Sequence, residues 1–261
     1  MQIPFKRFYI DERPDLNFHE VYETIKEYYP IGISMNYEKI QQLEPIKRLN
    51  KKIQDCIFSD EESNEWSNYL EKLEECFPNK KIFGNTKIQP GYGGVIEIGK
   101  TKGDEIISKE LHFYKSFLGK YYTIFGVDNI QYFDGEYYYM RFDPIITISP
   151  FDKYEDYFNT IKHQIGIDFP DYKFIPFDMG TLKIRGLSTV FSNELDNRDS
   201  TINQALFVNQ DYGKYNFIGD RTFGYDYWSP NIKENNWIAY PPKKWKGIEK
   251  STAGNNGYMP C

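Results

Sequence analysis

Three histidines, His19, His112 and His163, are the only imidazoles in the chain. Each falls in a segment whose apolar spacing predicts a helix. None has a second His or a Cys at the spacing of metal ligands, whereas zinc sites are built from clustered Cys and His side chains. We therefore expect neither a metal site nor a cofactor, and we interpret His112 and His163 as residues on or near helix surfaces.

Cys56 and one of the histidines could form a nucleophilic dyad, because a neighbouring base activates a thiol. Acidic residues surround Cys56 in the sequence, however, and negative charge disfavours the reactive thiolate. We interpret Cys56 as a buried structural residue. The other cysteines, Cys76 and Cys261, are far from it and from each other, so we expect free thiols in a reducing compartment rather than disulfides.

Residues 91–94, Gly-Tyr-Gly-Gly, are the one cluster of glycines. The cluster lacks the GxGxxG order, and strand-like runs flank it on both sides. Phosphate binding by such loops needs the N-terminus of a following helix. We expect a hairpin turn here.

Paired carboxylates could serve general acid–base chemistry, as in glycoside hydrolysis. By residue type, the candidates are Asp134, Glu136, Asp143, Asp220 and Asp226. The chain has 38 acidic residues, so coincidental neighbours are expected and spacing alone selects no pair. A hydrolase acting on a carbohydrate-like substrate stays an alternative, with Asp220 or Asp226 as the catalytic acid.

Negative charge is concentrated between residues 55 and 76. Only Lys72 offsets the eight acids of this segment, so its imbalance exceeds the net charge of the whole chain, which is -6. We call these acids the acidic patch: Asp55, Asp60, Glu61, Glu62, Glu65, Glu71, Glu74 and Glu75. A basic nucleic-acid footprint is absent. The patch favours electrostatic steering of a basic protein partner, and an ordinary solvated helix face is the alternative.

A second candidate surface lies near the C-terminus, where aromatic residues occur without clear periodicity. We call these residues the aromatic loops: Phe223, Tyr225, Tyr227, Trp228, Trp237 and Tyr240. Aromatic side chains on irregular loops are typical of recognition surfaces, because they supply contact area at a low cost in rotamer entropy. The alternative is that they cover the sheet and close the core.

Composition points to a globular core built from rings. The chain contains 23 Tyr and 20 Phe but only three alanines. Neither a signal peptide nor an apolar stretch of membrane-spanning length is present. The chain begins with Met1 and carries no tag. We expect a complete cytoplasmic protein that does not enter a membrane.

The elements that would position these residues alternate between helix and strand. Residues 59–77 have a capping box followed by helical spacing. Residues 104–118 and 149–166 also have helical spacing, and Asp134-Gly135 indicates a hairpin. Residues 205–208 look like a short strand.

An imperfect internal repeat suggests how the helices and strands are grouped into modules. Residues 77–83, FPNKKIF, resemble residues 169–175, FPDYKFI, and each copy follows an amphipathic helix. We predict an α+β fold with two related modules of mixed or antiparallel sheet and helices on one face. The expected boundaries are 1–102, 103–191 and a loop-rich extension at 192–261, with one compact domain as the alternative.

The overall character is acidic, aromatic-rich and poor in cysteine and catalytic motifs. It is similar in composition to small cytosolic binding proteins of bacteria, among them immunity proteins that neutralise secreted toxins. No residue can be carried over from that likeness. We expect a non-enzymatic protein-binding module, an inhibitor or immunity protein for a basic toxin or enzyme. The alternatives are the hydrolase and a structural or assembly subunit, and the sequence predicts no oligomeric state.

Overall fold

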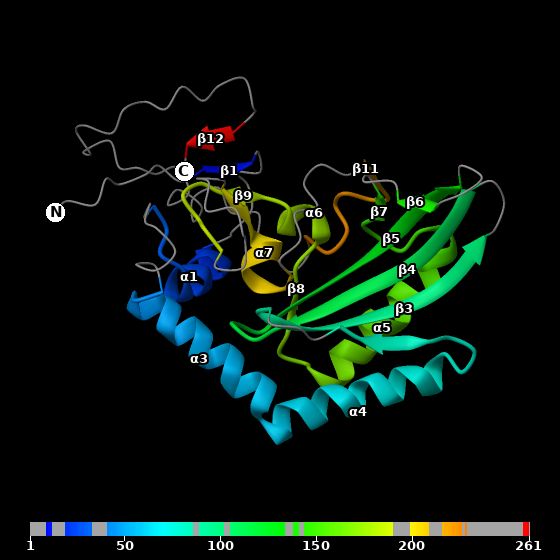
Figure 1. The fold of residues 1–261 in the computed structure, drawn as a ribbon, viewed down its shortest axis with the longest axis horizontal. Helices are drawn as coiled ribbons and strands as arrows, with labels where there is room; N and C mark the ends of the chain where they lie inside the picture. Colours follow the sequence, from blue (N-terminus) through cyan, green and yellow to red (C-terminus); the bar gives the residue numbers. More distant parts are fainter. Residues whose placement is uncertain are drawn as a thin grey trace.

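A computed structural model describes eleven parts of the chain: residues 9–11, 19–32, 41–85, 89–101, 105–133, 138–140, 144–189, 199–208, 216–225, 228 and 258–260. Helices and one large mixed sheet make up this structure (Figure 1). The predicted α+β class is therefore confirmed.

Eight strands of the described residues form the large sheet. Its centre is the antiparallel set β3 (Gly91–Thr101), β4 (Glu105–Ser116) and β5 (Tyr121–Phe133). Beside β3 lies β2 (Ile82–Gly84), and beside β5 lies β7 (Ile145–Thr147), followed by the parallel strand β11 (Asn216–Ile218). Two further strands pair with β5: β6 (Tyr138–Met140) antiparallel and β8 (Lys173–Phe174) parallel.

Helices lie on both faces of this sheet, whereas the sequence analysis placed them on one face (Figure 1). The long helices α4 (Asp60–Cys76) and α5 (Glu155–Asp168) cover one face, and η1 (Asp152–Tyr154) leads into α5. The short helices α6 (Phe177–Gly180) and α7 (Ile202–Leu206) cover part of the other. Towards the N-terminus, α1 (His19–Tyr28) is followed by α3 (Glu44–Phe58), which meets α4 at an elbow.

Two small antiparallel pairs complete the described structure. One joins β9 (Lys183–Ile184) to β10 (Ser200–Thr201). The other joins β1 (Tyr9–Asp11) to β12 (Tyr258–Pro260), so segments near the two ends of the chain lie side by side (Figure 1).

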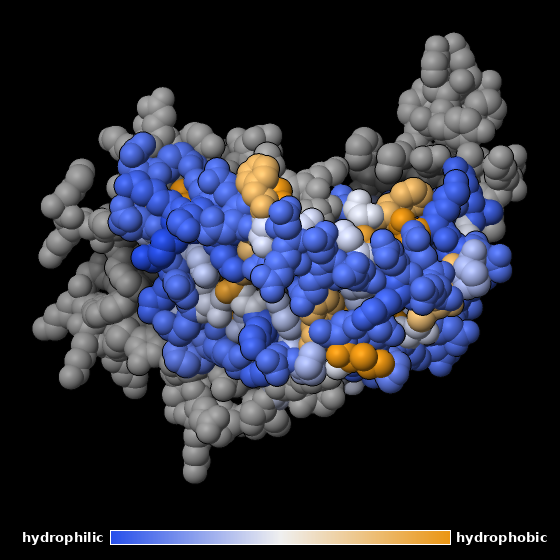
Figure 2. Space-filling model, turned by 90° about the horizontal axis from the view of Figure 1, so that it is seen from below, coloured by the Kyte–Doolittle hydropathy of each residue, from blue (hydrophilic) through white to orange (hydrophobic). Residues whose placement is uncertain are grey.

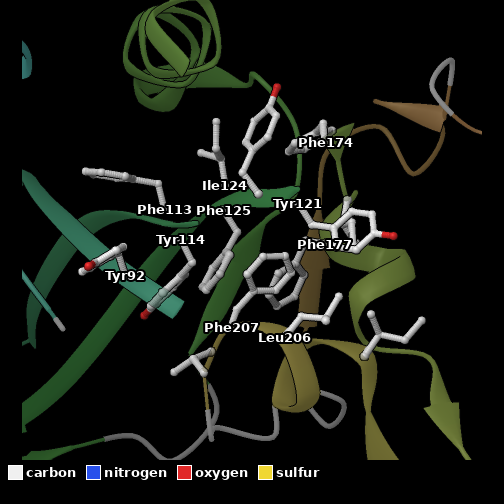
Figure 3. Close-up of a cluster of buried hydrophobic side chains, with 14 of the residues drawn as sticks. Tyr92, Phe113, Tyr114, Tyr121, Ile124, Phe125, Phe174, Phe177, Leu206 and Phe207 are labelled. Carbon is white, nitrogen blue, oxygen red and sulfur yellow. The ribbon is translucent and has the colours of Figure 1, made fainter. Parts of the chain in front are cut away.

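Aromatic rings fill the space on both sides of the central strands (Figure 3). Phe113 of β4 and Ile124 of β5 point to the side of α5, whereas Tyr114 and Phe125 point to the opposite side. On that opposite side Phe125 lies 4.3 Å from Phe177, measured between ring centroids. The composition's indication of a ring-built core is borne out in this cluster.

The predicted helix over residues 104–118 is wrong, because this segment is strand β4 and carries His112 in the centre of the sheet. Ile107, Leu111, Tyr114 and Leu118 have helical spacing, which produced the error. Both faces of β4 are covered over its C-terminal half, so apolar side chains occur at adjacent positions. The alternation of apolar and polar residues that marks a half-buried strand is therefore lost.

The predicted hairpin turn at residues 91–94 is also wrong, because these residues lie within β3. A Cβ atom on Gly94 would approach the ring of Phe113 to between 2.2 and 2.9 Å. A Cβ on Gly93 would lie 2.7 Å from a ring carbon of Tyr114. The glycines therefore make room for rings of the neighbouring strand, a role that glycine often has inside strands.

The ends of several elements differ from expectation. The predicted strand at residues 205–208 is wrong, because the first two of these residues are the end of helix α7. A capping box of Thr201 and Gln204 begins this helix. The helix expected at residues 149–166 begins later and continues to Asp168. By contrast, Ser59 caps α4 as predicted, accepting a hydrogen bond of 3.2 Å from the backbone N–H of Glu62.

The two copies of the imperfect internal repeat share a local structure. Phe77 ends α4 with φ -129° and ψ 64°, and Phe169 ends α5 with φ -131° and ψ 61°. The strands that follow differ, since β2 is antiparallel to β3 whereas β8 is parallel to β5. Duplication of whole modules stays a prediction, as do the domain boundaries, the first of which falls between the paired strands β3 and β4.

Candidate functional site

The acidic patch follows the elbow between α3 and α4. On α4, Trp66, Tyr69 and Leu73 are buried against the sheet, so most acids of this helix lie on its outer side. Figure 2 shows the surface on the side of the long helices as largely hydrophilic, with separate hydrophobic spots. An amphipathic helix on a sheet would give this arrangement whether or not a partner binds it.

Three acids of the patch have basic partners within the protein. Asp55 pairs with Lys51 at 2.8 Å, and Glu62 lies 3.7 Å from Lys52. Glu65 accepts a hydrogen bond of 2.6 Å from the buried ammonium of Lys115 on β4. These internal pairs reduce the charge that the elbow and the middle of α4 offer to a partner.

The other five acids of the patch are exposed and make no ion pair with any residue that the structure describes: Asp60, Glu61, Glu71, Glu74 and Glu75. Two of them lie in the first turn of α4, where the helix dipole stabilises negative charge. Glu74 and Glu75 lie in the last turn, which contains no basic residue. At that end the dipole disfavours negative charge.

Phe58 is a feature of this surface that the sequence analysis missed. It ends α3 at the elbow, and 81% of it is exposed. The buried residues of α3 (Ile46, Leu49, Ile53 and Cys56) follow helical spacing, and Phe58 lies off that face. The sequence signal was therefore an aromatic residue out of phase with the apolar face of α3, two residues before the first acid of α4.

The aromatic loops divide into a buried part and a part outside the described residues. Trp228 is 2% exposed and donates a hydrogen bond of 3.0 Å to the backbone oxygen of Phe174. Phe223 packs edge-on against Phe158 and Phe174, at 5.3 and 5.7 Å. Tyr225 is half-buried against the same core. For these three residues the contacts are those of a core. Tyr227, Trp237 and Tyr240 lie outside the described residues.

A polar cluster on β4 was also missed, because the segment was taken for a helix. Nε2 of His112 lies 3.0 Å from a carboxylate oxygen of Glu110, and Nδ1 lies 3.4 Å from the hydroxyl of Tyr114. Glu110 further accepts hydrogen bonds from Ser108 and Asn129, at 2.8 and 3.2 Å. Alternate residues of β4 thus form a carboxylate–imidazole–phenol chain on the face opposite α4 and α5.

The electrostatics of this cluster favour an ionised carboxylate. The hydrogen bond from His112 is the main cause that holds the pKa of Glu110 below its usual value, against the opposing effect of burial. Because an ionised carboxylate only accepts hydrogen bonds, Nε2 of His112 is the donor to Glu110. Glu97 of β3 is the cross-strand partner of Glu110 in the antiparallel register.

No family model, curated protein or solved structure matches the chain. In the described part of the chain, no helix has the length and apolar character needed to cross a membrane.

The other candidates of the sequence analysis are not brought together. Burial, followed by the neighbourhood of Glu62, raises the pKa of the Cys56 thiol to about 12, so this thiol is a poor nucleophile. His19 lies near Glu23 at the exposed start of α1. The described residues contain no group of three or more His, Cys, Asp or Glu side chains that could hold a metal ion.

Of the candidate catalytic acids, the structure describes only Asp220. Its carboxylate accepts hydrogen bonds from the backbone N–H and the hydroxyl of Thr222, at 2.8 and 2.7 Å, which is a turn-forming role. These hydrogen bonds lower its pKa. Asp134, Glu136, Asp143 and Asp226 lie outside the described residues.

Proposed function

We propose that the chain is a non-enzymatic cytosolic protein-binding module that recognises a basic protein through the outer face of α4. In its fuller form the proposal is an inhibitor or immunity protein that neutralises a basic toxin or enzyme. One observation carries it: Glu71, Glu74 and Glu75 crowd the C-terminal half of α4 without an ion-pair partner in the described part of the chain.

The position of these acids argues for a use outside the folded chain itself. Like charges on neighbouring turns repel, and the helix dipole adds to the unfavourable energy at this end. A sequence selected for stability alone would place Lys or Arg there. Natural proteins accept such local costs most often where function requires them.

Phe58 supplies an apolar element beside the charge. Strong interfaces combine a few aromatic anchors with a surrounding polar rim. Asp60 and Glu61 come just after Phe58, separated from it only by the capping residue Ser59, and are themselves exposed. A partner with an apolar pocket rimmed by Lys or Arg would complement this end of α4.

Two free thiols support the proposed location. Cys56 is buried and Cys76 is exposed, and neither is in a disulfide. Free thiols are typical of reducing compartments.

The test is affinity capture from the native lysate with wild-type protein and with a variant carrying Glu71→Gln, Glu74→Gln and Glu75→Gln. We expect one stoichiometric basic protein to elute with the wild type on raising the salt concentration. The variant should retain much less of it, because steering by unpaired charges is lost.

A matched control carries the same three neutralisations on α1, at Glu20, Glu23 and Glu27. It changes the net charge equally and should retain the partner. If both variants lost the partner equally, the cause would be the net charge of the protein and not the position of the acids on α4. Equal retention in both would remove the face of α4 from the proposal.

A different observation favours a second candidate, a carboxylate-dependent hydrolase. Glu97 and Glu110 occupy directly opposed positions on β3 and β4. Cβ atoms at such positions lie about 4.5–5.5 Å apart, and like charges there destabilise a sheet. The hydrogen bonds to Glu110 suit a carboxylate that must stay ionised, and exposed Glu97 could serve as the acid.

Glycan hydrolysis by the wild type, lost in both Glu97→Gln and Glu110→Gln, would support this second function. Glu155→Gln, at an exposed site on α5, is the control for the loss of one charge. Activity that survives in both β-strand variants would exclude these carboxylates.

A further inference from the structure

Lys115 is the most deeply buried lysine side chain among the ion pairs of the described residues, with 6% of its side chain exposed. Lysine is almost never buried unless its charge is compensated. The ammonium has one oxygen acceptor among the described residues, a carboxylate oxygen of Glu65 at 2.6 Å. One hydrogen bond leaves the two other N–H groups to be stabilised in another way.

Aromatic rings take that role. The Lys115 ammonium lies 4.0 Å from the ring centroid of Phe169, 5.4 Å from that of Tyr172 and 5.7 Å from that of Tyr92. All three distances are within the range of about 6 Å over which a ring face attracts a cation. The rings come from β3 and from the turn after α5, so the ammonium joins three parts of the chain.

The rings are held in place by their own contacts. The hydroxyl of Tyr92 donates a hydrogen bond of 2.7 Å to the backbone oxygen of Cys56, and Trp66 stacks on Tyr92 with centroids 5.6 Å apart. Phe169 and Tyr172 meet edge to face at 5.6 Å. The ring positions are therefore fixed by contacts that do not involve Lys115.

We propose that Tyr92, Phe169, Tyr172 and Glu65 form a binding site for a primary alkylammonium group, and that Lys115 is its resident ligand. The site is selective for positive charge, because ring faces and a carboxylate both attract a cation. Glu65 is 52% exposed, so the site borders solvent on this side. Because Glu65 belongs to α4, occupation of the site also fixes that helix on the sheet. The site does not depend on the function proposed for the acidic patch.

The test uses Lys115→Ala, which removes a propylammonium group and leaves its volume empty. We expect the melting temperature to fall by at least about 5 °C, since the truncation leaves a cavity among the rings and removes the cation–ring contacts of Lys115. Millimolar n-propylammonium should then raise the melting temperature of this variant, and 1-propanol, a neutral molecule of similar size, should not. An equal response to both compounds, or no response to n-propylammonium, would overturn the proposal.

Lys115→Met covers the case in which the alanine variant does not fold. Met keeps most of the apolar stem and removes the charge, so we expect a lower melting temperature than that of the wild type. A melting temperature equal to the wild-type value would show an apolar pocket without charge selectivity, which overturns the proposal. Lys120→Met is the matched control, because Lys120 pairs with Asp171 at 2.8 Å with both side chains largely exposed. Its melting temperature should stay close to that of the wild type.

Discussion

Single glycines on β3 leave the space in which aromatic rings of the neighbouring strand β4 pack against the backbone of β3. Gly94 supports the ring of Phe113, which is itself fully buried. Gly99, on the same strand, has open space where a Cβ atom would be. The same residue type therefore has a packing role at one position and none at the other.

Gly94→Ala should destabilise the protein by about 1–3 kcal/mol, because Phe113 must move out of its packed position. Gly99→Ala should be neutral or slightly stabilising, since an alanine restricts the unfolded chain. Urea unfolding of both variants measures the difference. Equal stabilities would contradict the packing role of Gly94.

Glu110 links a single residue to the pH dependence of stability. Its folded-state pKa lies below the ordinary value of 4.5, so its stabilising contribution is present above that value and is lost as the pH falls through the lower, folded-state pKa. Glu110→Gln should therefore lose about 1–3 kcal/mol at pH 7 and less in strong acid. His112 and Glu97 are the titratable neighbours on the strand face and must be kept unchanged.

Unfolding free energies of wild type and Glu110→Gln, measured from pH 7 down to pH 3, test this. The gap between the two curves should narrow with acidity. Glu155→Gln, which removes an exposed carboxylate, should give nearly parallel curves. A constant gap for Glu110→Gln would contradict the role of its ionised form.

At the scale of elements, β4 shows what local pattern can and cannot predict. A strand covered on both faces needs apolar residues at odd and even positions, so its sequence loses alternation and can match helical spacing by chance. The identity of such a segment depends on β3 and β5, which pair with it over most of its length. Helix α4, with one solvent-facing side and a capping serine, could be predicted from its own residues.

The same distinction applies to the candidate sites. The acidic patch could be predicted because it depends only on the composition of one continuous segment, residues 55–76. The chain of Glu110, His112 and Tyr114 was not, because its geometry exists only if the segment is a strand. The Lys115 site was beyond prediction for a similar reason, since its rings come from separate elements.

Neutralising an acid of helix α4 should change the stability of the protein in opposite directions at the two ends of the helix. Glu74→Gln and Glu75→Gln should each stabilise the protein by about 0.3–1 kcal/mol, because they remove negative charge from the C-terminal end of the helix dipole. Glu61→Gln, in the first turn of the same helix, should destabilise it by a similar amount. Thermal unfolding at low salt gives the largest differences. Changes of the same sign at both ends would contradict the dipole argument.

At the scale of the whole molecule, the central sheet joins segments from both halves of the chain. Strands β3 and β4 are paired in antiparallel register over ten residue pairs, although the expected module boundary lies between them. Helix α4 from the first half packs beside α5 from the second, where Lys72 and Asp168 form an ion pair at 2.5 Å. Such an arrangement favours the alternative of one compact domain.

We expect β3, β4 and β5 to unfold in one cooperative step, because removing either half exposes the paired edge and the rings of the other. Native-state hydrogen exchange in increasing urea tests this. Amides of β3 and β4 should converge on the same opening free energy, whereas those of the short edge strands β2 and β11 should exchange through smaller openings. Separate opening energies for residues before and after 102 would instead establish two modules. In that case the shared ring cluster could not be the main source of stability, because each half would have to remain folded without the other's rings.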